Sequence, residues 1–98
     1  SLMSFFRHRY KIKGLYLLDE PETALSPKSQ LELVRVLIDA AAAQQAQFII
    51  ATHSPVLLAT PGAKILSFDG APIHIMQYRD TEYYQFYRDF MNNMESYF

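Results

Sequence analysis

The sequence predicts an α/β fold built on a parallel strand–helix–strand core. Two short apolar runs, residues 15–19 and 48–52, each end in polar side chains. The segment between them, residues 27–46, carries charged side chains every three to four residues, which is the period of a helix surface. Because such connections are right-handed crossovers, we expect the strands to be parallel, with their carboxyl ends at one edge of a sheet.

Residues that end or begin a helix or strand mark the boundaries of the first elements. Residues 2–10 are expected to form a helix, and Gly14 releases the chain into the strand at 15–19. The continuous apolar character of this strand is typical of one covered on both faces. The long helix begins at Pro27, whose missing N–H costs nothing at the first helical position, and Ser26 has the side chain of an N-cap.

The long helix is expected to bury one stripe of side chains. The members of this predicted stripe are Leu31, Val34, Leu37, Ile38 and Ala41. The strand at 48–52 comes next, and Ser54 with Pro55 repeats the cap-and-proline pattern, which indicates a second helix of about one turn.

A hairpin and a last helix are predicted for the rest of the chain. Residues 64–68 and 72–78 read as two strands joined by a turn at Asp69-Gly70, and we expect this hairpin to widen the sheet. The last helix is expected to begin at Asp80. Its apolar stripe, which is typical of a core-facing surface, is Tyr83, Tyr87, Phe90, Met91 and Met94.

Candidate functional residues lie at the ends of the two core strands. Asp19 and Glu20 are adjacent carboxylates, and an ionised carboxylate there needs a metal, a cation or a proton partner to offset its desolvation. His53 follows the second strand, so parallel strands would bring it to the carboxylates. The structural alternatives are an acidic cap for Asp19 and a satisfied buried imidazole for His53. Glu22 we interpret as part of a solvated turn.

The segment from Gly14 to Pro55 resembles the C-terminal half of the nucleotide-binding domain of ABC-type P-loop ATPases. Leu-Tyr-Leu-Leu-Asp-Glu, ending in Asp19 and Glu20, matches the Walker B pattern. Pro-Glu-Thr-Ala-Leu-Ser at 21–26 resembles the D-loop, and His53 matches the switch histidine. The resemblance implies a partial P-loop NTPase fold.

Two further features refine the resemblance. Transporter D-loops usually carry an Asp where this chain has Ser26 followed by Pro27, so neither the usual contact across the dimer nor transport is implied. Phe-Asp-Gly at 68–70 and Arg-Asp-Phe at 88–90 resemble a bacterial group of predicted stand-alone ATPases related to ABC and DNA-repair ATPases.

The implied activity is ATP binding and hydrolysis. By the resemblance, Asp19 holds Mg²⁺ and Glu20 is the catalytic carboxylate that activates water, while His53 contacts the terminal phosphate as a binding and catalytic residue. ATP and Mg²⁺ are the implied cofactors, and two such domains would sandwich two nucleotides.

The phosphate-binding loop of such ATPases is missing from these 98 residues. None of the three glycines begins a Gly-x-x-x-x-Gly-Lys-Ser/Thr sequence, and the ABC signature is absent too. We therefore expect residues 1–98 to be the C-terminal fragment of an ATPase domain. Its first partner would be the remainder of that domain in a longer parent, and alone it would neither bind ATP nor be active.

Composition narrows the classes of partner. A formal net charge of −1 gives no broad basic surface, and the cluster at Arg7, His8, Arg9, Lys11 and Lys13 is interpreted as a solvated helix end, with nucleic-acid contact as the alternative. The absence of cysteine excludes disulfides and fits a cytoplasmic protein. No apolar run is long enough to insert directly into a membrane.

The aromatic content suggests self-association. Seven tyrosines and seven phenylalanines are too many for a chain of 98 residues to leave in water, so we expect a homodimer or higher oligomer, formed through the last helix or an exposed strand edge. The alternative function is a non-catalytic interaction or dimerisation module that uses the acidic strand end and the aromatic stripe.

Overall fold

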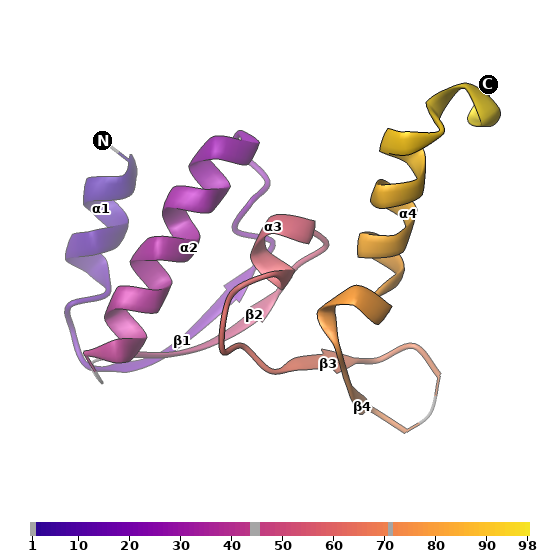
Figure 1. Ribbon diagram of the computed structural model, residues 1–98. Coiled ribbons are helices and arrows are strands. Elements are labelled where there is room, and N and C mark those ends of the chain that lie inside the picture. The colour runs from indigo at the N-terminus through magenta and orange to yellow at the C-terminus, as the bar shows by residue number, and fades with distance from the viewer. Residues whose placement is uncertain (1, 44–45, 71) are drawn as a thin grey trace. The chain divides into compact units, whose positions relative to one another are not determined.

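The computed structural model describes residues 2–43, 46–70 and 72–98 and divides the chain into two units. The first extends to Pro61 and the second runs from Gly62 to Phe98. The first unit holds a strand–helix–strand core, and the second holds a hairpin and a terminal helix (Figure 1).

Two parallel strands form the sheet of the first unit. β1 (Gly14–Asp19) pairs with β2 (Ala46–Ala51) in a register that sets Asp19 opposite Ala51. Both strands therefore end at the same edge, which confirms the predicted parallel arrangement. The result is a small α/β unit, compatible with part of a P-loop NTPase fold.

Three helices accompany the strands. Figure 1 shows α1 (Leu2–Arg9) and α2 (Pro27–Ala42) lying on the same side of β1 and β2, with α3 (Pro55–Leu58) after β2. The Ser26 side chain accepts a hydrogen bond from the Ser29 N–H, which confirms the predicted cap of α2. That cap fixes where the loop after β1 ends.

The core of the first unit lies between the helices and one face of the sheet. Its buried hydrophobic residues are Tyr10, Leu33, Val34, Val36, Leu37 and Leu57. Tyr10 packs edge-on against the rings of Tyr16 on β1 and Phe48 on β2, with each pair of ring centroids 5.0 Å apart. The aromatic residue directly after α1 thus packs against both strands.

The long helix departs from prediction at its end. The prediction over 27–46 is wrong there, because α2 stops at Ala42 and Ala46 already pairs in β2; residues 44–45 lie outside the described part of the chain. Val34 and Leu37 are buried as predicted, but Leu33 is buried in place of Leu31, which is 43% exposed. The buried face of α2 is rotated from the predicted one because α2 packs against α1 and α3 as well as β2.

The sheet of the first unit is covered on one face only within the described residues. Leu15, Leu17 and Ile49 point to the other face, and Leu17 is 72% exposed. The prediction of a strand covered on both faces is therefore wrong for this chain. Side chains alternate along a strand, and α1, α2 and α3 share one core on the face that carries Tyr16 and Leu18.

The second unit begins with the predicted hairpin. β3 (Ile65–Ser67) pairs in antiparallel register with β4 (His74–Met76), and Gly70 in the connection has a φ of 77°, a conformation that favours glycine. The two strands form a two-stranded sheet of their own, so the expectation that they widen the first sheet is wrong. Residue 71 lies outside the described residues.

The terminal helix starts later than predicted. A short 3₁₀ turn, η1 (Tyr78–Asp80), comes first, and α4 (Glu82–Asn92) then begins with buried Thr81 as its N-cap. The Thr81 hydroxyl accepts a hydrogen bond from the Tyr84 N–H. A second 3₁₀ turn, η2 (Met94–Tyr97), follows α4.

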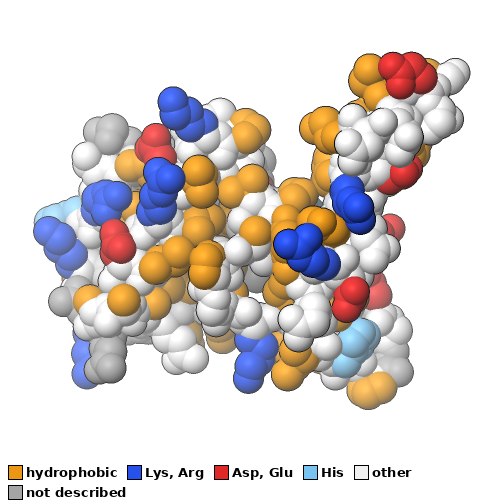
Figure 2. Space-filling model, viewed as in Figure 1, with side chains coloured by type: hydrophobic (Ala, Val, Ile, Leu, Met, Phe, Trp, Pro, Cys, Tyr) orange, Lys and Arg blue, Asp and Glu red, His pale blue; other side chains and the backbone are white. Residues whose placement is uncertain are grey.

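The apolar stripe of α4 is not a buried surface. No residue of α4 is buried, and Met91 is 75% exposed, so the prediction of a core-facing stripe is wrong for this chain. Figure 2 shows hydrophobic side chains at the surface along α4. The rings of Phe86, Phe90 and Tyr97 instead form a small cluster between α4 and η2. A unit of this size has too little chain to cover more.

Candidate active site

The candidate site lies where β1 and β2 end. The Glu20 N–H donates a hydrogen bond of 2.7 Å to the carbonyl oxygen of Ala51, the last residue of β2, so the first loop residue is tied to the neighbouring strand. The loop after β1 and the loop after β2 therefore start side by side. The structure brings Asp19, Glu20 and His53 to this one edge.

Glu20 has an unusual backbone. Its φ is 48°, in the left-handed region that non-glycine residues seldom adopt. The conformation is held from both sides, since the Glu20 carbonyl accepts hydrogen bonds from the Thr23 N–H at 3.2 Å and the Thr23 hydroxyl at 2.8 Å. Backbone strain of this kind tends to occur at functional sites. Here it turns the chain directly after Asp19.

Glu20 and His53, two of the three predicted site residues, form a direct side-chain pair. Oε1 of Glu20 lies 3.5 Å from Nε2 of His53, and the two side chains are 51% and 64% exposed. An exposed pair of this kind contributes little to stability. The pair is thus better suited to presenting a carboxylate and an imidazole to a ligand than to holding the fold together.

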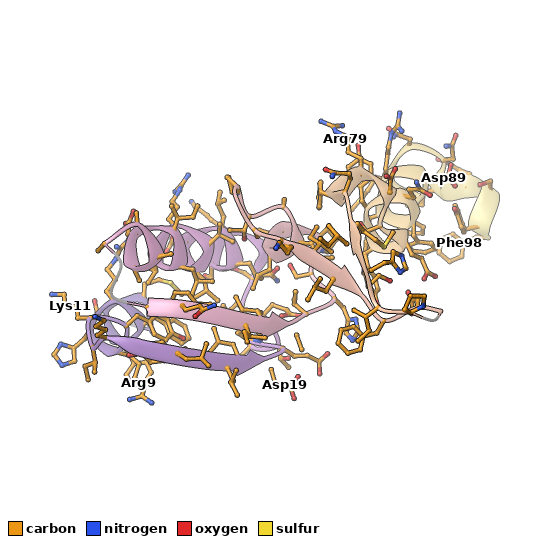
Figure 3. All side chains as sticks on the ribbon, turned by 90° about the horizontal axis from the view of Figure 1, so that it is seen from below. Arg9, Lys11, Asp19, Arg79, Asp89 and Phe98 are labelled. Atoms are coloured by element: carbon orange, nitrogen blue, oxygen red, sulfur yellow. The ribbon has the colours of Figure 1, made fainter. Side chains whose placement is uncertain are left out.

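Asp19 occupies the last position of β1, as Figure 3 shows. Alternation along the strand places its side chain on the open face with Leu15 and Leu17, and it is exposed. A single exposed carboxylate fits Mg²⁺, which proteins usually bind through one or two carboxylates plus phosphate and water oxygens. No group of three or more His, Cys, Asp or Glu side chains among the described residues could hold a metal by itself.

Glu22 is the residue of this edge that the sequence interpretation missed. Its Oε1 accepts a hydrogen bond of 2.6 Å from the Thr52 hydroxyl, and its Oε2 accepts one of 3.2 Å from the His53 N–H. The side chain therefore bridges the two loops and is not part of a solvated turn. A signal was present in the sequence: a third carboxylate soon after Asp19 faces two polar residues at the end of the parallel strand.

The loop after β2 is further fixed by Ser54. This buried serine accepts hydrogen bonds from the N–H groups of Val56 and Leu57, which confirms the predicted cap of α3, and its hydroxyl donates to Oε1 of Gln30 at 2.5 Å. Gln30 in turn donates from Nε2 to the carbonyl of Leu25. The second loop is thus attached to the start of α2.

The remaining candidate groups make contacts of their own, none of them with the three predicted site residues among the contacts described here. Arg7 forms an exposed ion pair with Asp39, and Arg9 lies over the Tyr16 ring, which supports the structural interpretation of the basic cluster. His74 belongs to the second unit, where its Nδ1 contacts the Pro72 carbonyl. Over residues 2–43, 46–70 and 72–98, the helices are all too short or too polar to cross a membrane.

Comparison with known proteins gives one family. A family described as "AAA domain, putative AbiEii toxin, Type IV TA system" matches residues 6–59, which is more than half of the chain and includes both strand ends with their loops. No curated protein matches the chain. The family supports a domain of the P-loop ATPase type. This chain belongs to the AAA domain family so described.

Proposed function

We propose that this chain is the part of an ABC-type ATPase domain that carries the hydrolytic groups, within a longer P-loop ATPase that binds and hydrolyses ATP. The observation that carries the proposal is the contact between Glu20 and His53 at the shared end of two parallel strands, beside Asp19. Family membership supports the nucleotide-binding class. The proposal assigns the Walker B roles to Asp19 and Glu20 and the switch-histidine role to His53.

Each residue has a role that its position supports. Asp19 would hold Mg²⁺, because its exposed carboxylate is an oxygen ligand of the kind that ion prefers. Glu20 would orient the attacking water and accept its proton. His53 would donate a hydrogen bond from its ring toward the terminal phosphate. Bound Mg²⁺ and ATP would supply the electrophilic phosphorus and neutralise the charge of the triphosphate.

The decisive experiment replaces Glu20 by Gln in the longer ATPase. The amide keeps the shape and loses the basic oxygen, so we expect ATP to bind as before while turnover falls by about 100-fold or more. The matched control is Glu32→Gln, which makes the same change of charge on α2. Unchanged hydrolysis by the Glu20 variant would remove Glu20 from the catalytic role.

The 98-residue chain tested alone provides a second measurement. It lacks a glycine-rich phosphate loop, so titration with Mg-ATP in a calorimeter should give no binding heat. A dissociation constant near 1 μM, about −8 kcal/mol, would mean that this chain forms a complete nucleotide site.

We also propose that the chain associates with a second copy of itself through α4 and η2, a function that does not require hydrolysis. The observation in its favour is the exposure of Met91 at 75% and Phe98 at 96%, beside the ring cluster of Phe86, Phe90 and Tyr97. Sedimentation equilibrium should give a mass above 11.4 kDa, and Met91→Glu should lower it. Asn92→Glu, on the polar side of α4, is the control. A monomer at every concentration would exclude self-association.

A further inference from the structure

Glu22 uses both oxygens of its carboxylate on the loop that carries His53. One oxygen accepts from the Thr52 hydroxyl at 2.6 Å, and the other accepts from the His53 backbone N–H at 3.2 Å. The two donors are adjacent in sequence and are separated from Glu22 by the whole of α2 and β2. A single side chain thus connects the turn after β1 to the loop after β2.

The Thr52 hydroxyl extends this connection. While it donates to Glu22, it accepts a hydrogen bond of 3.0 Å from the Ser54 N–H. Ser54 is buried and is held in turn by Gln30 and by the start of α3. His53 therefore lies between two residues whose polar groups are already occupied. Its backbone has little freedom to leave the strand edge while Glu22 remains in place.

His53 is contacted at both ends by the same turn. Its ring nitrogen Nε2 meets the Glu20 carboxylate at 3.5 Å, and its backbone N–H meets the Glu22 carboxylate at 3.2 Å. Glu20 is itself locked by its left-handed φ and by the bonds from Thr23. The distance between the imidazole and Glu20 thus depends on Glu22 keeping its hold on the loop.

The chemistry of this contact requires a carboxylate of this length. Two ionised oxygens accept two donors, and hydrogen bonds to a charged acceptor are stronger than neutral ones. Glutamine would retain the bond from Thr52 but would point N–H groups at the His53 N–H, so one contact becomes a repulsion. Aspartate would fall short by one methylene.

We propose that Glu22 is a positioning residue of the site, which holds the His53 loop against the Glu20 turn. It touches neither the reacting atoms nor a ligand in this role and acts through His53. The catalytic consequence rests on the function proposed above, whereas the structural connection does not depend on that function.

The structural half of the proposal is tested by amide hydrogen exchange of the 98-residue chain, followed by NMR. Glu22→Gln should speed exchange of the His53 amide by about tenfold, since a typical net hydrogen bond corresponds to about that factor. Glu32→Gln is the matched control, because its side chain makes no hydrogen bond or ion pair within the described residues. Equal exchange of the His53 amide in both variants would overturn the proposal.

The functional half is tested by kinetics in the longer ATPase. Glu22→Gln should lower kcat by about 10- to 100-fold with KM for ATP within about twofold, because a small misplacement of a reacting geometry costs rate more than binding. Thr52→Val should lower kcat in the same direction, and Thr52→Ser, which keeps the hydroxyl, should restore it. A wild-type kcat for Glu22→Gln would overturn the positioning role.

The two proposals fail differently. If Glu20→Gln hydrolyses ATP normally, the proposed catalytic function is wrong, and the exchange of the His53 amide still decides whether Glu22 holds the loop. If Glu20→Gln is inactive while Glu22→Gln and Thr52→Val turn over normally, the site is catalytic and Glu22 has no positioning role.

Discussion

Glu20 and His53 meet across the ends of β1 and β2, with Oε1 of the carboxylate 3.5 Å from Nε2 of the ring. The two residues are far apart in sequence, and three features bring them together: the parallel register, the left-handed turn at Glu20, and the hold of Glu22 on the loop. Each feature can be altered separately. Changes to these three features should affect stability and turnover to different extents, because the exposed Glu20–His53 pair itself contributes little to stability.

The turn at Glu20 predicts an unusual preference for glycine. At a φ of 48° a Cβ atom is strained, so Glu20→Gly should be more stable than Glu20→Ala by about 1 kcal/mol. The same pair of changes at Glu32, in the middle of α2, should give the opposite order by about 1 kcal/mol. Urea denaturation of the four variants measures both differences. Equal stabilities for the two Glu20 variants would mean that the turn relaxes.

Ser54 predicts a large effect for the loss of one hydroxyl. It caps α3, is buried and donates to Gln30, so Ser54→Ala should lower the free energy of unfolding by about 2 kcal/mol. Ser26→Ala removes an exposed cap of α2 and should cost about 1 kcal/mol or less. Thermal unfolding of the two variants measures both losses. A larger loss for Ser26→Ala would contradict the role assigned to the hydrogen bonds of Ser54.

The sequence was sufficient for the arrangement of the strands but not for the environment of their faces. Parallel pairing follows from local order along the chain, because a helix between two strands leaves few connections. Whether Leu17 is covered depends on chain elsewhere, and here it is 72% exposed. The exposure of Met91 has the same cause: the sequence identifies the apolar stripe of its helix but not the surface that would cover this stripe.

In the candidate site, too, local sequence predicts some features while others depend on residues elsewhere in the chain. Asp19, Glu20 and His53 were identified from their positions at strand ends, and the structure brings all three to one edge. Glu22 was missed because its importance depends on which side chain lies opposite it. That information is a contact between Glu22 and Thr52, thirty residues later, and the local sequence shows only a third carboxylate soon after Asp19.

The burial pattern of α2 predicts that two leucines of this helix contribute very differently to the free energy of unfolding. Leu33 is fully buried at 0% exposed and Leu31 is 43% exposed on the same helix. Leu33→Ala should lower the free energy of unfolding by about 2–5 kcal/mol through lost burial and a cavity, and Leu31→Ala by less than about 1 kcal/mol. Chemical denaturation measures both. Comparable losses would mean that Leu31 belongs to the buried surface of α2, as the sequence alone predicted.

Tyr10 predicts a loss of stability in alkaline solution. Burial raises the pKa of its hydroxyl above 10.0, and neighbouring Arg9 offsets only part of this. The folded state therefore keeps a proton that the unfolded state releases, so the stabilisation is fully present below pH 10 and is lost as pH rises through the folded pKa. Tyr10→Phe removes this titration and keeps the ring against Tyr16 and Phe48. The free energy of unfolding, followed from pH 8 to 11.5, should fall less steeply for Tyr10→Phe than for the unmodified chain, and parallel curves would show that Tyr10 ionises freely in the folded state.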